Sequence, residues 1–188
     1  MSPEQRAAAR ASPVLPGSAR AWAVALRPRS LGIAASPVVL GTAFAWARTG
    51  EVDARLGALA LAAALLMQIL TNLQNDVGHT LRLGAAATAH PGLPRATAQR
   101  WLGVQAVRLA IVSLALLATG LGLALFALRG WPVLVIGATS LAAALAYMGG
   151  PRPIAYTPLG EATVFFFFGP VAVAGTEWLQ RRAKGRTR

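Results

Sequence analysis

Long apolar segments alternate with short polar segments along this chain. Five apolar segments have about the 17–25 residues that a helix needs to cross a bilayer. They lie at about 31–47, 56–75, 107–128, 131–148 and 159–179. Charged side chains gather at the ends of these segments, where they reach water. The pattern predicts an all-α, polytopic membrane helical bundle with about five transmembrane helices.

Composition and charge narrow the class of protein further. The chain has 188 residues, of which 55% are hydrophobic and 13% are charged. It contains no cysteine, which excludes a disulfide framework and a thiolate metal site. A net charge of +12 is the usual mark of nucleic-acid binding. Here the basic residues lie between apolar segments, so we expect membrane lipid around the protein and no nucleic-acid partner.

The positions of the basic residues predict an orientation. They occur before the first span (Arg20, Arg27, Arg29) and between the second and third spans (Arg82, Arg95, Arg100). The positive-inside rule therefore predicts that the N-terminus and the loops after spans two and four are cytoplasmic. Five spans then place the C-terminal end outside, although residues 181–188 are strongly basic. We expect three regions: a disordered cytosolic tail (1–20), a transmembrane region (21–180) and a basic tail (181–188).

One polar stripe interrupts the second apolar segment, in the sequence QILTNLQNDVGH (68–79). Asn72, Asn75 and Asp76 have the i, i+3, i+4 spacing that places side chains on one helix face, and Gln68 lies one turn earlier. A buried carboxylate without compensation costs several kcal/mol, and a divalent cation relieves that cost. One interpretation is a Mg²⁺–diphosphate pocket that opens to the cytoplasm. The other is a helix end capped by Asn and Asp.

A second polar cluster follows the fourth apolar segment, in GGPRPIAYTPLGE (149–161). Arg152 and Tyr156 offer donors that suit phosphate oxygens, and Glu161 begins the fifth segment. The plainer interpretation is that Arg152 is an interfacial anchor, Tyr156 is an interfacial aromatic and Glu161 is an acid at a helix start. Both clusters are predicted on the same membrane face, which favours a shared pocket. The aromatic run VFFFF (164–168) is interpreted first as lipid-facing or packed, and second as the lining of an isoprenoid channel.

Several segments resemble the 1,4-dihydroxy-2-naphthoate polyprenyltransferases, the menaquinone branch of the UbiA superfamily of intramembrane prenyltransferases. They are WAVALRPRSLGIAASPVVLGT (22–42), QILTNLQNDVG (68–78), GLPRATAQRWL (92–102) and the segment 147–180. The resemblance covers about residues 20–180 and is most specific in the last segment. It implies a helical bundle around a central cavity, in a family of about nine helices.

The resemblance also implies a reaction and a set of site residues. With Mg²⁺, polyprenyl diphosphate is ionised, the 1,4-dihydroxy-2-naphthoate ring attacks the allylic cation, and carboxylate is lost. Asp76 and Asn72 would hold the metal, and the catalytic set would be Asp76, Asn72, Arg152 and Tyr156. The substrate-binding candidates are Asn75, Gln68, Arg27 and Glu161. The expected location is the inner membrane of a bacterial cell.

The sequence also departs from the family pattern. His79 stands where the family usually has a second carboxylate, and the stretch LRLGAAATAH that follows has no acid. The family's second Asp-rich motif is absent from these 188 residues, so we expect a chain truncated after the fifth helix. Activity would then need self-association or a separately encoded C-terminal half. Two alternatives stay open: an inactive relative that binds prenyl diphosphate or a partner, and a small non-enzymatic transporter or structural membrane protein.

Overall fold

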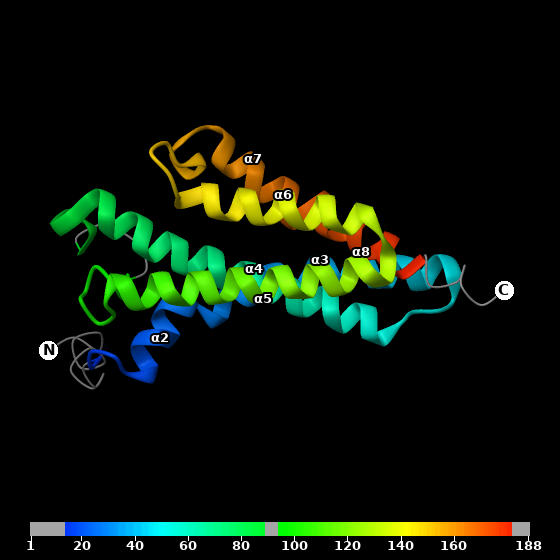
Figure 1. The fold of residues 1–188 in the computed structure, drawn as a ribbon, viewed down its shortest axis with the longest axis horizontal. Coiled ribbons are helices and arrows are strands. Elements are labelled where there is room, and N and C mark those ends of the chain that lie inside the picture. The colour runs from blue at the N-terminus through cyan, green and yellow to red at the C-terminus, as the bar shows by residue number, and fades with distance from the viewer. Residues whose placement is uncertain (1–13, 89–93, 182–188) are drawn as a thin grey trace, which may run out of the picture.

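The structure is a computed structural model that describes residues 14–88 and 94–181 (Figure 1). All regular elements in these two ranges are helical. The α-helices are α2 (Ala19–Leu26), α3 (Leu31–Thr49), α4 (Ala54–Leu83), α5 (Val104–Arg129), α6 (Trp131–Met148), α7 (Leu159–Phe166) and α8 (Ala172–Arg181). Short turns η1 (Pro28–Ser30), η2 (Gly84–Thr88) and η3 (Ile154–Tyr156), and a π-helical turn (Phe167–Val171), join them.

Five helical stretches in the described ranges are long and apolar enough to cross a membrane. They are Ala19–Thr49, Ala54–Leu83, Val104–Arg129, Trp131–Met148 and Leu159–Arg181. The predicted all-α membrane bundle with five spans is therefore confirmed, and the protein is an integral membrane protein. The last span bends at Gly169, whose φ of −108° and ψ of −105° are not helical, and the next residue is Pro170, which lacks an N–H group.

The second span differs from its expected length. The apolar pattern ends near residue 75, whereas α4 continues to Leu83 and ends at Gly84, which has φ 52°. Asn75, Asp76 and His79 therefore lie within the helix and not at its end. The polar residues stay helical because other elements cover this last part of α4.

Helix α4 lies at the centre of the fold. It packs against α2, α3, α5, α6 and α8. Leu70, Leu73 and Val77 of α4 are buried together with Ala21 and Ala25 of α2. Figure 1 shows that the end of α4, the start of α5 and the end of α6 gather at the left of the view. Leucine, valine and phenylalanine side chains on the outer faces of α3 and α5 are exposed, as lipid contact requires.

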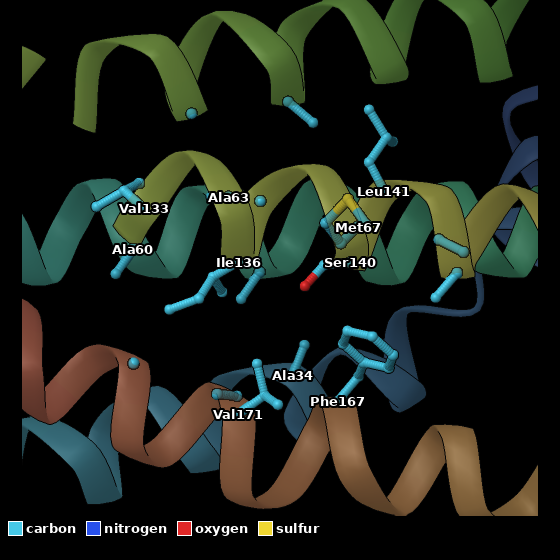
Figure 2. A pocket seen from close by; sticks show the side chains of 18 of the residues that line it. Ala34, Ala60, Ala63, Met67, Val133, Ile136, Ser140, Leu141, Phe167 and Val171 are labelled. Carbon is cyan, nitrogen blue, oxygen red and sulfur yellow. The ribbon is translucent and has the colours of Figure 1, made fainter. Parts of the chain in front are cut away.

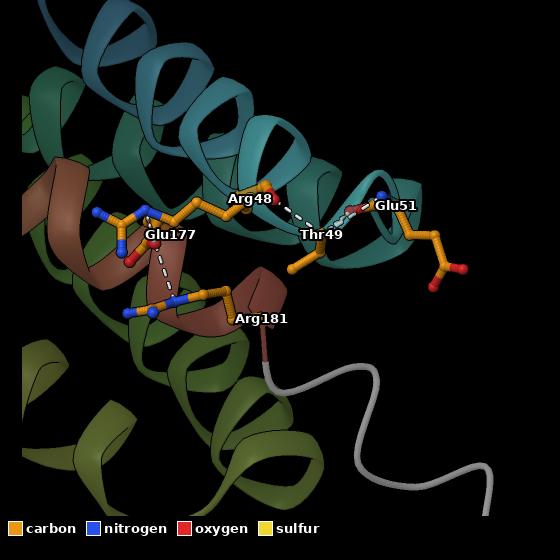
Figure 3. A network of polar contacts seen from close by, with 6 residues as sticks. Arg48, Thr49, Glu51, Glu177 and Arg181 are labelled. Carbon is orange, nitrogen blue, oxygen red and sulfur yellow. Dashed lines mark hydrogen bonds and ion pairs between the residues drawn. The ribbon is translucent and has the colours of Figure 1, made fainter.

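At the opposite end of the molecule, α8 is held closely against α3 and the start of α4. The Glu177 carboxylate lies 2.9 Å from Arg181 Nε and 3.6 Å from Arg48 Nε (Figure 3). The Gln180 side chain accepts a hydrogen bond from Asp53 N–H at 2.8 Å and donates one to Asp53 O at 3.1 Å. These contacts tie the end of the last span to the turn between the first two.

The two predicted tails lie mostly outside the described residues. Residues 1–13 and 182–188 are not described, and neither is His90 in the loop after α4. Within 14–20, Gly17 N–H donates to Trp101 O at 2.8 Å, and the Ser18 hydroxyl caps α2 by accepting from Ala21 N–H at 3.2 Å. Arg181 is the last residue of α8.

Candidate active site

The polar stripe of α4 faces the break between α2 and α3. Gln68 and Asn72 are 7% and 4% exposed. Asn72 donates to Leu26 O at 2.8 Å and to Ser30 Oγ at 2.9 Å. Gln68 donates to Ser30 Oγ and to Asn72 Oδ1, both at 3.2 Å. The two amides therefore fix η1, the turn that directly follows Arg27, onto α4.

Asp76 is fully buried, and its carboxylate is bound by the loop that precedes α5. Oδ2 accepts a hydrogen bond from Ala96 N–H at 2.7 Å, and Oδ1 accepts one from Thr97 N–H at 2.8 Å. The Thr97 hydroxyl also donates to Oδ1. These donors compensate the burial of the charge. In this arrangement Asp76 holds residues 96–97 against α4, and both of its oxygens accept hydrogen bonds from that loop.

Asp76 is the one carboxylate of the polar stripe, so a Mg²⁺ ion here would take most of its oxygen ligands from water and substrate phosphates. Magnesium needs near-octahedral oxygen ligands, commonly one or two carboxylates with waters and substrate phosphates. The two described ranges hold no group of three or more His, Cys, Asp or Glu side chains. Asn72 Oδ1 already accepts from Gln68, and both Asp76 oxygens accept from the backbone.

Two arginines beside the stripe have unpaired donors, and we call Arg27 and Arg95 the arginine pair. Nε and Nη2 of Arg27 and Nε of Arg95 are buried without a hydrogen-bond partner in the part of the chain that the structure describes. The positive charge of Arg95 acts unfavourably on the Arg27 guanidinium, whereas the negative charge of the Asp76 carboxylate acts favourably on it. Arg27 also has a left-handed backbone, with φ 51°. Like charges, unpaired donors and backbone strain together indicate an anion-binding position.

An apolar cavity of about 350 Å³ lies between α3, α4, α5, α6 and the α7–α8 span. Figure 2 shows Met67, Ser140 and Phe167 pointing into it from different elements. Val164, Phe167 and Phe168 line it, whereas Phe165 and Phe166 are more than half exposed. The aromatic run is thus divided between the two interpretations: part of it lines a cavity, and part faces outward.

The cavity adjoins the amide network. Met67 and Thr71 line the cavity, and the next residue after each, Gln68 and Asn72, belongs to the network. Ala34 of α3 also lines the cavity, one turn after Ser30. One side of the cavity therefore lies next to the amide network on α4.

The second predicted cluster packs against the end of α4. Tyr156 Oη and His79 Nδ1 are hydrogen-bonded at 3.0 Å. Arg82 donates to Met148 O at 2.8 Å and to Gly150 O at 2.6 Å, which fixes the start of the Gly-Pro loop. The structure thus brings the two predicted polar segments together at one end of the molecule.

Other predicted site residues make fewer contacts. Arg152 and Glu161 are exposed, and no contact in the described ranges joins either of them to Asp76. Asn75 is half-buried on α4. Sequence reasoning used Arg95 and Arg82 only as evidence of orientation. The signal that could have pointed to Arg95 was its place in the segment 92–102, which resembles a known family, whereas Arg82 lies outside the resembling segments.

Comparison with known proteins identifies related chains. The 1,4-dihydroxy-2-naphthoate octaprenyltransferase of Escherichia coli (strain K12) is 35% identical over 167 residues, covering 86% of this chain and 54% of the relative. The protein of the same name from Mycobacterium tuberculosis is 36% identical over 122 residues, covering 65% and 41%. That from Bacillus subtilis (strain 168) is 32% identical over 139 residues, covering 69% and 42%.

These relatives confirm the resemblance read from the sequence. The chain spans about half the length of the curated relatives that it matches. No family model matches the chain, and no solved structure matches it.

Proposed function

We propose that this chain, a relative of the 1,4-dihydroxy-2-naphthoate octaprenyltransferases, is a membrane prenyltransferase of menaquinone biosynthesis. Its substrates would be a polyprenyl diphosphate and 1,4-dihydroxy-2-naphthoate. The observation that carries the proposal is the apolar cavity of about 350 Å³, whose lining residues Met67 and Thr71 are followed directly on α4 by the amides Gln68 and Asn72. Such a site matches an amphiphile with a long apolar chain and an anionic head.

The arginine pair supplies the binding chemistry. During transfer, the allylic C–O bond breaks and diphosphate leaves with the electron pair. A C–C bond then forms to the ring carbon that carries the carboxylate, and the ring's bond to that group breaks with release of carbon dioxide. Arg27 and Arg95 offer unpaired N–H groups to diphosphate oxygens, and guanidinium groups bind such oxygens in pairs. Their positive charge would stabilise the negative charge that develops on the leaving group. The amides of Gln68 and Asn72 would position Arg27 through η1, and Asp76 would position Arg95 through its neighbour Ala96.

The remaining predicted roles stand as proposals. Arg152 and Tyr156 would contact the diphosphate from the Gly-Pro loop, and Asn75 and Glu161 would contact substrate. Tyr156 is the best supported of these, because its hydroxyl is hydrogen-bonded to His79 of α4, three residues after Asp76.

Binding of Mg²⁺ and assembly with a second chain are also proposals. Relatives with this name are prenyltransferases, and Mg²⁺ would neutralise the diphosphate when bound. Because the described donors do not form a metal site alone, further oxygen ligands would come from the substrate or from residues outside the described ranges. A second copy of the chain or a separately encoded half is the predicted source, and light scattering of the detergent-solubilised protein would measure such an assembly. The proposed location is the bacterial inner membrane, with the α4–α5 loop in the cytoplasm.

One observation favours a second candidate function, which is binding of prenyl diphosphate without catalysis. Asp76 is engaged in structural hydrogen bonds, and His79, next to it on α4, bonds to Tyr156. A chain of this kind would keep the cavity and the arginine pair and would form no product.

A prenyl-transfer assay in reconstituted membranes tests the proposal. The chain, a polyprenyl diphosphate, 1,4-dihydroxy-2-naphthoate and Mg²⁺ are expected to give the prenylated naphthol. Ala63→Phe fills the cavity from α4 and should lower product formation more for long prenyl donors than for short ones. Ala106→Phe, on the exposed face of α5, is the matched control. If the chain binds diphosphate and forms no product, the second candidate function is supported. If it shows no binding and no product, both candidate functions are contradicted.

A further inference from the structure

A second hollow, of about 440 Å³, lies where the ends of α4 and α6 meet the start of α5. We call it the cationic groove. It is lined by Gln74, Val77, Gly78, Leu81, Arg82, Arg108, Met148, Gly149, Gly150 and Pro151. Figure 1 shows these three helix ends gathered at the left of the view.

The groove continues the helix faces that line the apolar cavity. On α4, Thr71 lines the cavity, and Gln74 and Gly78, which follow at helical spacing on the same face, line the groove. On α5, Arg108 lies about three helical turns before the cavity residue Thr119 and therefore shares its face. The same faces are thus apolar along the cavity and cationic at the membrane edge.

Two guanidinium groups supply the charge of the groove. Arg82 is fixed by three hydrogen bonds to the carbonyls of Gly78, Met148 and Gly150, which leave some of its five N–H donors free. Arg108 makes no hydrogen bond or ion pair with the residues that the structure describes, and it lies in the first turns of a largely apolar helix. No carboxylate of residues 14–88 or 94–181 lines the groove.

We propose that Arg82 and Arg108 bind the phosphate group of a lipid amphiphile at the membrane edge. Basic pockets between transmembrane helices are suited to anionic headgroups, and the adjoining helix faces are apolar enough to contact an acyl or isoprenoid chain. The phosphate has two sources, an anionic phospholipid of the bilayer or a prenyl diphosphate. The proposal goes beyond the prenyl-transfer site, because neither the arginine pair nor Asp76 lines the groove.

Native mass spectrometry of the detergent-solubilised chain tests the proposal with two ligands. Phosphatidylglycerol is titrated against the zwitterionic phosphatidylcholine, and farnesyl diphosphate is titrated separately. Arg108→Gln should weaken binding of at least one phosphate ligand by about tenfold, as expected for a charged hydrogen bond. Arg55→Gln removes the same charge from the exposed start of α4, at the other end of the molecule, and should leave both affinities unchanged.

The pattern of losses identifies the source. If Arg108→Gln lowers the affinity for phosphatidylglycerol alone, the groove binds a membrane phospholipid. If it lowers the affinity for farnesyl diphosphate alone, the groove binds a prenyl donor. Because Arg108 has no described partner, its substitution should leave the helical circular dichroism unchanged. The proposal is overturned if the Arg108→Gln and Arg55→Gln variants bind both phosphate ligands equally well. It is also overturned if phosphatidylcholine binds as tightly as phosphatidylglycerol and Arg108→Gln leaves the affinity for farnesyl diphosphate unchanged.

Discussion

Single residues in this chain combine structural and chemical roles, and Asp76 is the clearest case. Its carboxylate occupies a fully buried position and accepts from two backbone N–H groups and one hydroxyl of residues 96–97. The charge therefore has compensation within the fold, before any ligand is considered. Arg27 is the opposite case, because its buried donors have no described partner and its backbone is strained.

Asp76→Asn tests the structural role of the Asp76 carboxylate. The amide has one acceptor oxygen and one donor group, so one of the two N–H groups at residues 96–97 would lose its partner. We expect a loss of about 1–3 kcal/mol in the stability of this loop. Hydrogen exchange of residues 94–102 measures it, without any substrate or metal.

Thr97→Val is the companion variant, because it keeps both backbone donors to Asp76 and removes the Thr97 hydroxyl, which bonds to Asp76 and to Thr80. It should raise exchange in the same loop by a smaller factor. Unchanged hydrogen exchange in both variants would contradict the structural role of Asp76. Its carboxylate would then be available to bind a ligand.

Helices were the most predictable elements, and their polar ends were the least. Apolar runs fixed the five spans because each run is long enough to cross the bilayer. The extension of α4 past residue 75 was missed because Asn72 and Asp76 resemble an exit from the membrane. Their partners, Leu26, Ser30 and Thr97, are distant in sequence, and no local pattern reveals such pairing.

The same reason explains which parts of the candidate site were found. Spacing alone placed Gln68 and Asn72 on one face of α4, which the structure also shows. It did not reveal that the face of Asp76 is covered by a loop, or that Arg95 lies near Arg27. Both facts depend on tertiary packing.

Contact between α3 and α8 gives a prediction at the scale of elements. A Cβ atom on Gly41 would lie 2.5 Å from Val173 O and 2.8 Å from Thr176 Cβ, whereas one on Gly32 of the same helix would meet nothing within 4 Å. Gly41→Ala should therefore push α8 away from α3 and lower the melting temperature in detergent. Gly32→Ala is the matched control and should be neutral or stabilising, because alanine favours the helix by up to about 1 kcal/mol. Equal melting temperatures for the two variants would contradict the close packing.

At the scale of the whole molecule, the two ends have different chemistry. One end holds the amide network, the arginine pair and the cationic groove, while the other is tied by Glu177, Gln180 and their partners. The apolar cavity lies between the two ends. Such a division suits a protein that binds an amphiphile by its anionic head at one membrane face and holds its chain among the helices.

The central claim is that the arginine pair holds the diphosphate of a prenyl donor, and binding to an Arg27 variant tests it most directly. Arg27→Gln removes the charge beside the amide network, and Arg29→Gln removes the same charge from an exposed position two residues later in η1. Affinity for a polyprenyl diphosphate is measured by isothermal titration calorimetry on the reconstituted chain. The account predicts binding at least about tenfold weaker in Arg27→Gln and unchanged in Arg29→Gln. Equal affinities in the two variants would contradict it.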